Sequence, residues 1–498
     1  GQISLGYNRT FGRHALDGAV NFHISGYNGD GYFSYKYHYA NLNGRINYSY
    51  DDRYVAEFGF SYFGNDAYAK GNQWAFYPSV SAAWVLSNEA FLKDSKVVDL
   101  LKLRLSYGRS GFADSGATGV LSNYSSNGRY LFKDYYTNSY VGSFYMGSGE
   151  GVWQSSLVHM FLANAGVHAE KSSKYNVGID AELFGKLHLS ADAFIDKRTD
   201  ILTLDNSMMG YYGKNYYFDN IGKMTNKGVE LSAVWNDLRA NWGYSINGSV
   251  SFNRNKIDYM AEVAPAYSYN AQTGRPYGTL IGLVADGFYD VDDFNADGSL
   301  REGLPVSSYQ NTVRPGDVKY RDLNRDGRID DYDRTYQLYA AVPEIYYGFS
   351  VELKYRGFGV SAYFQGVAHS TLETTLSSIY QPLYGNDRNV SEYYMEHRWS
   401  RFNTEGRYPH LTTLANGNNY TQSSLWTENG NFLKLRTLQA YYKLPSKIAR
   451  KLRMRECSFY FRGLNLFSAD HVGILDPEYV STGYPSSRSY QIGLNVIF

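Results

Sequence analysis

The last nine residues of the chain, Tyr490 to Phe498, read YQIGLNVIF and alternate in polarity. Every second residue belongs to one wholly apolar set: Tyr490, Ile492, Leu494, Val496 and Phe498. The residues between them are mostly polar or small. Successive side chains of a β-strand point to opposite faces of the sheet. The stretch is therefore predicted to be a strand with one apolar face, closed by an aromatic residue.

The same alternation recurs along the whole chain, in pairs of strands joined by very short turns. Residues 175–183 and 187–195 alternate on either side of the turn 184–186, and residues 347–355 and 358–364 do so around Arg356-Gly357. The faces opposite the apolar ones are polar: Asn176, Asp180, Glu182, His188, Asp192 and Asp196. Repeated alternation with Tyr and Phe at strand ends is typical of strands between lipid and a polar lumen. The terminal aromatic resembles the assembly signal of bacterial outer-membrane barrels.

The composition fits the same prediction. Of the 498 residues, 51 are Tyr and 49 are Gly, and aromatic residues make up 17%. Tyr prefers sites with one apolar and one wet end, which the aromatic girdles of membrane barrels supply. Mean hydropathy is −0.45, and we find no apolar run long enough for a transmembrane helix. A polar average is expected of a barrel, because only alternate residues meet lipid.

Several classes of function are disfavoured by the composition and the motifs. The net charge is +0, which gives no argument for nucleic-acid binding. The single Cys457 excludes an intrachain disulfide and a Cys-rich zinc site. The 10 His residues show no H-E-x-x-H spacing, and no G-x-S-x-G elbow occurs. The sequence therefore predicts that this protein is not an enzyme.

Short and long connections alternate, as short periplasmic turns and long external loops do in outer-membrane barrels. If the last strand ends in the periplasm, the periplasmic turns are 51–53, 87–100, 184–186, 236–242, 356–357 and 445–455. The external loops are then 26–41, 64–73, 109–173, 199–226, 257–344, 368–430 and 468–488. This assignment predicts about 15 strands, an odd number, whereas single-chain bacterial barrels have even numbers. We therefore expect the chain to be a fragment of a longer secreted precursor, with open sheet edges at residues 2–11 and 490–498.

Five segments, in order, resemble the SusC-type TonB-dependent transporters of Bacteroidetes. Residues 44–54 resemble that family's GRxNYSYxDRY stretch, residues 71–84 its GNRWGxFPSVSAGW stretch, and residues 226–231 its NKGVEL stretch. Residues 316–324 resemble GDIKYKDLN. The run Phe432-Leu433-Lys434-Leu435-Arg436, followed by Asn465-Leu466-Phe467 and Asp476-Pro477-Glu478, resembles the C-terminal part of the family. These matches extend over nearly the whole chain.

The resemblance implies the fold and the activity. It implies that residues 1–498 are the C-terminal part of an all-β, transmembrane antiparallel barrel of 22 strands, whose N-terminal plug is absent from this sequence. It implies TonB-dependent import of oligomers, glycan or peptide, across the outer membrane. The partners would be a SusD-like surface lipoprotein, TonB through the missing N-terminal region, and outer-membrane lipid. Alternatives are a passive large-pore porin and a surface-binding platform without transport.

One acidic stretch follows the order of ligands in a calcium-binding loop. Oxygen-bearing or carbonyl ligands fall at the expected positions 1, 3, 5, 7, 9 and 12: Asp322, Asn324, Asp326, Arg328, Asp330 and Asp333. Gly327 at position 6 permits the sharp turn. Asp333 departs from the usual Glu and has a shorter reach. Both a structural Ca²⁺ site and an Asx-rich turn without an ion remain open.

Two other groups of residues are candidates for binding. Loop aromatics on which sugars or peptide side chains could stack are Trp153, Tyr211, Tyr212, Tyr216, Tyr217, Tyr380 and Tyr384. Each could equally hold loops together or contact a lid. A basic cluster in the predicted periplasmic turn comprises Lys447, Arg450, Lys451, Arg453 and Arg455, with Ile448, Leu452 and Met454 beside it. This turn could be one short helix that meets anionic headgroups, or it could simply be solvated.

Overall fold

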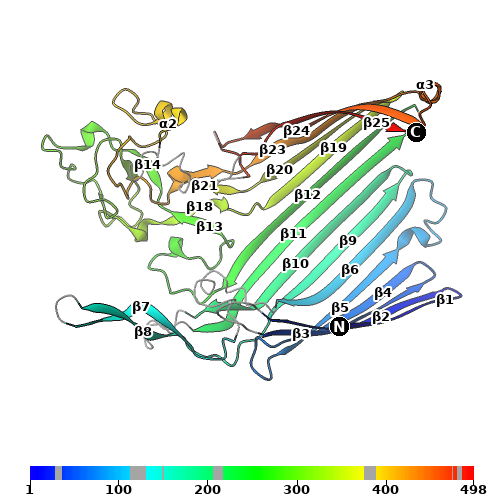
Figure 1. Ribbon diagram of the computed structural model, residues 1–498, viewed down its shortest axis with the longest axis horizontal. Helices are drawn as coiled ribbons and strands as arrows, with labels where there is room; N and C mark the ends of the chain where they lie inside the picture. Colours follow the sequence, from blue (N-terminus) through cyan, green and yellow to red (C-terminus); the bar gives the residue numbers. More distant parts are fainter. Residues whose placement is uncertain are drawn as a thin grey trace. The chain divides into compact units, whose positions relative to one another are not determined.

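The computed structural model describes residues 1–28, 36–112, 130–147, 151–205, 217–239, 241–374, 389–473, 475–478 and 485–498 (Figure 1). Fifteen strands form one sheet in which every pairing with a described register is antiparallel, and their order in the sheet follows the chain. They are β1 (Gln2–Phe11), β2 (His14–Asn28), β3 (Lys36–Tyr50), β4 (Tyr54–Asn65), β5 (Trp74–Val85), β6 (Val98–Phe112), β9 (Glu170–Leu183), β10 (Leu187–Leu204), β11 (Phe218–Leu238), β12 (Trp242–Tyr259), β19 (Ile345–Tyr355), β20 (Phe358–Ala368), β23 (Phe432–Lys443), β24 (Glu456–Asp470) and β25 (Ser489–Ile497). The predicted all-β class and strand number are confirmed.

Shorter elements occupy the connections. The strands are β7 (Tyr135–Met146), β8 (Val152–Phe161), β13 (Thr279–Gly282), β14 (Ala285–Phe288), β15 (Val306–Ser307), β16 (Val318–Tyr320), β17 (Arg328–Ile329), β18 (Thr335–Ala340), β21 (Thr371–Glu373) and β22 (Thr427–Asn429). The helices are α2 (Glu392–His397) and α3 (Ser446–Lys451), with 3₁₀ turns η1 (Leu86–Asn88), η2 (Ser268–Asn270), η3 (Val291–Asp293), η4 (Asp331–Asp333) and η6 (Ser424–Trp426). In the described parts of the chain, no helix is long and apolar enough to cross a membrane.

The two faces of the sheet differ as the alternation predicts. In the last hairpin Phe459 lies opposite Leu494, and Phe461 lies opposite Ile492. All four side chains are exposed. Large apolar side chains left uncovered at alternate positions would be unfavourable in water, and in a membrane they face acyl chains.

The two terminal strands of the sheet each have one partner. Among the described residues β1 pairs only with β2, and β25 pairs only with β24. All ten residues of β1 are exposed. Each of these strands therefore leaves one backbone edge open, as the odd strand number predicts. Unpaired backbone is costly in hydrocarbon, so the pairing of these edges with further strands stays a prediction.

The contacts divide the chain into two compact units. Unit 1 comprises 1–231, 253–264 and 272–275, and unit 2 comprises 232–252, 265–271 and 276–498. Unit 1 has a small buried core where connecting segments pack against strand ends: Tyr68, Leu131, Val167, Ala169, Leu202 and Phe218. Unit 2 has two such clusters, one around Leu283, Val318, Tyr320 and Ile329 and one around Tyr394, Tyr408 and Trp426. External segments in both units are therefore folded and have apolar interiors.

Several predicted loop boundaries were wrong because strands continue past the alternating stretch. β10 continues to Leu204 and β11 begins at Phe218, inside the predicted loop 199–226. β6 and β9 likewise extend into the predicted loop 109–173, which also contains the hairpin of β7 and β8. Outside lipid the ladder of hydrogen bonds can continue without a polarity pattern, so periodicity alone ends the strands too early. The short helix expected in 445–455 is present as α3.

Candidate functional site

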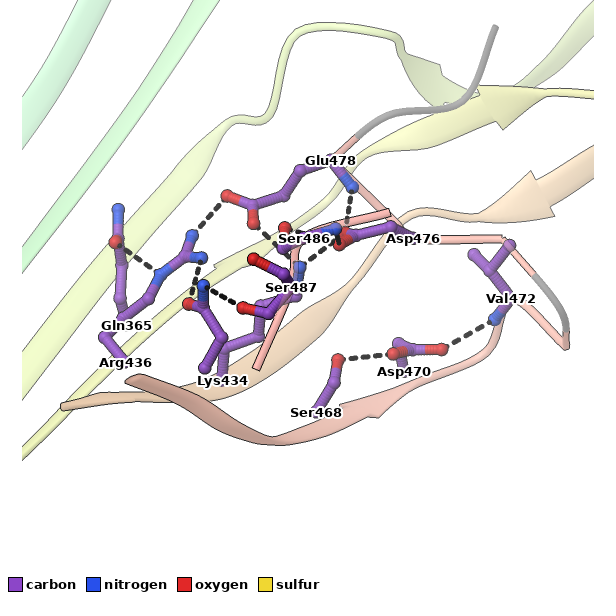
Figure 2. A network of polar contacts seen from close by, with 11 residues as sticks. Gln365, Lys434, Arg436, Ser468, Asp470, Val472, Asp476, Glu478, Ser486 and Ser487 are labelled. Atoms are coloured by element: carbon purple, nitrogen blue, oxygen red, sulfur yellow. Dashed lines mark hydrogen bonds and ion pairs between the residues drawn. The ribbon is translucent and has the colours of Figure 1, made fainter. Parts of the chain in front are cut away.

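A buried cluster of ions joins β23 to the connection that follows β24 (Figure 2). Lys434 lies near the start of β23, and its side chain is only 5% exposed. Its ammonium group contacts Asp476 and lies 2.7 Å from Glu478 Oε2. Arg436, two residues along the same strand face, contacts the other oxygen of Glu478. The segment Asp476-Pro477-Glu478 is thereby held against the strand.

The carboxylate of Asp476 also organises the chain on both sides of it. One oxygen accepts from the backbone N–H of Glu478 at 3.0 Å, and the other accepts from Ser486 N at 2.9 Å and Ser486 Oγ at 2.6 Å. Burial alone would raise the pKa of Asp476, but the hydrogen bonds from Lys434 and Ser486 outweigh it and hold the pKa well below the ordinary range. Asp476 is therefore ionised at neutral pH, and its charge is matched by Lys434.

A second buried network joins two external segments of unit 2. Asp317 is buried, and its Oδ1 accepts from Asn416 Nδ2 at 2.8 Å and Asn419 Nδ2 at 2.7 Å. Asn419 Oδ1 in turn accepts from the backbone N–H of Val318 at 2.9 Å, and Asn418 Nδ2 donates to the Val318 carbonyl at 2.8 Å. Side-chain amides thus complete the hydrogen bonding of a buried strand, as a neighbouring strand would.

The aromatic cluster of unit 2 lies beside this network. Trp426 is fully buried, with its ring 6.0 Å from that of Tyr408 and 5.6 Å from that of Tyr420. Its indole N–H donates to the Asn419 carbonyl at 2.7 Å. The segments 276–344 and 389–431 therefore share one interior. This buried interior was not predicted, because its residues are far apart in sequence.

In the acidic stretch 322–333, backbone N–H groups donate to carboxylates of the same stretch. Asp322 accepts from the backbone N–H of Arg325 at 2.6 Å and of Gly327 at 2.8 Å. Gly327 has φ +82°, a conformation that favours glycine, as expected for position 6. Asp333 is fully buried and accepts from Leu323 N at 2.8 Å. The turn expected from the spacing is therefore present.

The remaining oxygens of this loop also face backbone donors. Asn324 Oδ1 accepts from Asp326 N at 3.0 Å, and Asp326 Oδ1 accepts from Arg328 N at 2.9 Å. Asp333 Oδ2 accepts from Asp330 N at 3.0 Å. Within the described ranges, no three His, Cys, Asp or Glu residues are grouped as metal ligands would be. This geometry accounts for the Asx-rich turn, and calcium binding stays a prediction.

The predicted loop aromatics are only partly described. Tyr211, Tyr212, Tyr216, Tyr380 and Tyr384 lie outside the described residues. Trp153 lies on β8 with 63% of its surface exposed, and its ring is 5.6 Å from that of Tyr145 on β7. Tyr217 is half-buried just before β11. Trp153 therefore remains available for contact with a ligand or a partner.

A charged cluster on the polar face of unit 1 was not predicted. Arg104 Nε and Nη2 donate to both oxygens of Asp180 at 2.7 and 3.0 Å, and Nη1 and Nη2 donate to both oxygens of Asp192 at 2.9 and 2.8 Å. Asp180 and Asp192 were placed on this face by alternation. Arg104 alternates with the exposed Leu103 and Leu105, which is the signal that could have identified it.

Two hollows lie on the same polar face. One, of about 470 Å³, is lined by Arg104 and Asp192 with Lys174, Asn176, Asp196 and Asn226 among others. The other, of about 740 Å³, includes Arg45, Glu57, Tyr77 and Arg109 in its wall. Charges of both signs line these hollows. A wall of this kind can hydrate and guide polar solutes, which a lipid-facing surface cannot do.

Comparison with known proteins identifies the family. The family model described as "TonB dependent receptor-like, beta-barrel" matches residues 1–311. The chain is 27% identical over 489 residues to TonB-dependent receptor P3 of Formosa agariphila, which covers 91% of this chain and 45% of that protein. It is 25% identical over 480 residues to TonB-dependent receptor SusC of Bacteroides thetaiotaomicron, covering 91% and 43%. The chain thus spans less than half the length of these relatives.

Solved structures confirm the fold. The RagAB peptide transporter superposes with a TM-score of 0.73 at 18% identity, covering 99% of this chain and 55% of that chain. The RagAB peptide importer in the "open-open" state gives a TM-score of 0.72. Because the family model matches well over half of its residues, the chain belongs to the TonB-dependent receptor β-barrel family, and it is an outer-membrane protein.

Proposed function

We propose that this chain forms the barrel wall of a TonB-dependent importer that carries oligomeric nutrients, glycans or peptides, across the outer membrane. Its family consists of transporters, not enzymes, which confirms the expectation that it is not an enzyme. The observation that carries the proposal is the sheet itself, with an apolar outer face and a polar face bearing the Arg104 cluster. Energy coupling would come from TonB through a region outside residues 1–498.

The charged wall suits transient contact with polar cargo. Arg104 is shared between Asp180 and Asp192, and all three side chains remain partly exposed. Such a wall can offer hydrogen bonds to hydroxyl and peptide groups and does not hold one strong ion site. Conduction and import need binding that is favourable on entry and weak enough for release. This is consistent with an oligomer of mixed polarity as cargo.

We further propose a SusD-like surface lipoprotein as the partner. The hairpin of β7 and β8 exposes large apolar side chains on both strands, including Phe144, Tyr145, Trp153 and Leu157. Exposed apolar patches outside the membrane mark interaction sites. The likeness to the RagAB peptide transporter supports the class of assembly, and the resemblance to SusC supports a lid. Contacts with a lid would cover the aromatic side chains of this hairpin.

Growth tests address the transport proposal. Cells that lack this gene should lose growth on either a peptide digest or a glycan digest as sole nutrient. Inactivating TonB should produce the same loss, whereas growth on the matching monomers should be unchanged. Unimpaired growth without TonB would favour the passive porin. If uptake of both digests were undiminished after deletion of the gene itself, the protein would not be the importer, and a surface-binding platform without transport would be favoured.

Purification tests the partner. The intact transporter, taken from its native membrane in mild detergent, should carry a surface lipoprotein. Replacing Trp153 and Leu157 with Ser should weaken that association, while the matched change Leu338→Ser in an external strand of unit 2 should not. A transporter that never carries a lipoprotein, in cells whose uptake survives deletion of the neighbouring lipoprotein gene, would remove the lid from the account.

Calcium binding at residues 322–333 is a separate proposal, supported by the order of its oxygen-bearing residues. A bound Ca²⁺ would neutralise carboxylates that otherwise stand close together in this external loop. Its role would be structural. Chelation with EGTA should then raise the protease sensitivity of the loop, and added Ca²⁺ should restore protection. Cleavage that is identical with EGTA and with Ca²⁺ would leave only the Asx-rich turn.

A further inference from the structure

The connection between β23 and β24 differs from the other short connections in its charges. Residues 447–455 contain five basic side chains and no acidic one: Lys447, Arg450, Lys451, Arg453 and Arg455. All five are exposed, and none forms an ion pair with any residue that the structure describes. The chain as a whole has 48 basic and 48 acidic residues. This cluster is therefore an unbalanced positive patch in a neutral chain.

Arginine residues of two other short connections have acidic partners. Arg53 Nη2 lies 2.7 Å from Asp51 and its Nη1 lies 3.0 Å from Glu89. Arg239 Nε lies 3.2 Å from Asp237. The basic side chains of α3 and of residues 452–455 have no such acidic partner among the residues that the structure describes. Glu456, the nearest acid along the chain, instead pairs with Lys443 at 2.7 Å.

The fold presents this patch together with apolar side chains. Ile448 on α3 and Leu452 just after it are four residues apart, which places them on one side of the helix, and they are 46% and 57% exposed. Ala449, between them, is buried, and α3 contacts β24, where Cys457 is also buried. The helix is therefore fixed to the strand while its aliphatic and basic side chains are left uncovered.

The position of α3 along the strands places it at the membrane boundary. Arg455 N donates to the Ile497 carbonyl at 2.6 Å, so this connection adjoins the end of the last strand (Figure 1). The exposed apolar residues Phe459 and Leu494 begin a few residues further along the strands. Short connections in outer-membrane barrels face the periplasm. The patch thus lies where the apolar belt ends and phospholipid headgroups begin.

We infer that α3 and residues 452–455 form a binding surface for anionic phospholipid headgroups of the periplasmic leaflet. Ile448 and Leu452 would enter the acyl boundary, and the basic side chains would extend to the phosphates, as long cationic side chains do at membrane interfaces. Two features commit the surface to lipid, namely its positive charge and its continuity with the lipid-facing strands. The inference does not depend on the cargo or on the external partner.

Lipid retention tests this inference. The intact transporter is reconstituted into nanodiscs of phosphatidylethanolamine with one tenth phosphatidylglycerol, extracted in mild detergent, and its bound lipids are counted by mass spectrometry. The native protein should be enriched in phosphatidylglycerol. The matched variant replaces four cations with glutamine: Lys447→Gln/Arg450→Gln/Lys451→Gln/Arg453→Gln. Its phosphatidylglycerol enrichment should be about fivefold lower than that of the native protein, because each cation near an anionic surface strengthens the attraction. High salt should reduce the enrichment in the native protein.

A matched control carries the same change of charge elsewhere. The exposed external residues Lys70, Arg301, Arg314 and Arg401, each replaced with Gln, should leave the enrichment unchanged. Folding yields in pure phosphatidylcholine liposomes should be equal for both variants, which separates lipid binding from failure to fold. Equal phosphatidylglycerol retention by the native protein and the α3 variant would overturn the inference. So would full displacement of the lipid by millimolar inorganic phosphate, which would indicate an anion patch only.

Discussion

The guanidinium of Arg104 lies against the backbone of Gly178 on the neighbouring strand. The two residues are paired in register, and a Cβ built at position 178 would stand 2.7 Å from Arg104 Cζ. Only the absence of a side chain there lets Arg104 extend across β9 to Asp192 on β10. The side chain of Arg104 thus links β6, β9 and β10 on the polar face of the sheet, and it can do so because residue 178 is glycine.

Replacing Gly178 should weaken the contacts of Arg104 on the polar face and lower the stability of the sheet. Gly178→Ala is expected to displace Arg104 from Asp192 and to cost about 1–3 kcal/mol of unfolding free energy, the usual cost of overpacking. Urea unfolding in liposomes measures the loss. Gly248→Ala on β12 is the matched control, because a Cβ there meets nothing within 4 Å. Equal unfolding midpoints for the two variants would contradict this account of Gly178.

The two faces of the last strand should respond differently to charge. Leu494→Arg places a cation in the apolar belt near its periplasmic end and should cost about 1–2 kcal/mol, between the costs at the interface and at the midplane. Asn495→Arg should be milder, because its side chain lies on the polar face. Folding yields of both variants in liposomes provide the measurement. Equal yields would show that the assignment of the faces is reversed.

The ion cluster of Lys434 should fix the last external connection. Asp476→Asn removes one charge from a pair whose side chains are 5% and 8% exposed, and it should destabilise that region by about 3–5 kcal/mol. Limited proteolysis within residues 471–488 should therefore accelerate. Asp286→Asn is the control, because its pair with Arg321 is half exposed and should contribute less than about 1 kcal/mol. Unchanged proteolysis in Asp476→Asn would contradict a stabilising role for the cluster.

The same cluster predicts a dependence on pH. The pKa of Asp476 is lowered in the folded protein, so its stabilising contribution is fully present above the unfolded value of about 4. It is lost only as the pH falls through the lower folded-state value. The difference in proteolysis between the native protein and Asp476→Asn should therefore persist from pH 7 to pH 5 and shrink in stronger acid. A difference that already disappears at pH 6 would require another group.

The sequence predicted those features that depend on short-range periodicity. The alternation identified the strands, their faces and the odd strand number, because each residue of a membrane strand meets either lipid or a polar wall. The short helix α3 followed from the basic and aliphatic residues of one connection. These features need no knowledge of residues that are distant in sequence.

Other features were missed because they depend on distant residues. Asp317 meets Asn419 across 102 positions, and Lys434 meets Asp476 across 42. No local pattern indicates that these polar residues become buried together. The acidic stretch 322–333 shows the opposite difficulty, since its spacing fits both a calcium loop and a turn whose carboxylates accept backbone N–H groups. Whether such a stretch binds a cation depends on the orientation of its carboxylate oxygens, and the spacing of the residues does not determine that orientation.

The central claim is that this chain belongs to an energy-coupled importer and not to an open pore. Conductance of the intact transporter in a planar lipid bilayer tests it most directly and requires no knowledge of the cargo. We predict no steady ion current at neutral pH, because an importer that depends on TonB keeps its barrel closed until it is energised. A steady current typical of a wide aqueous channel would contradict the claim and support a passive porin.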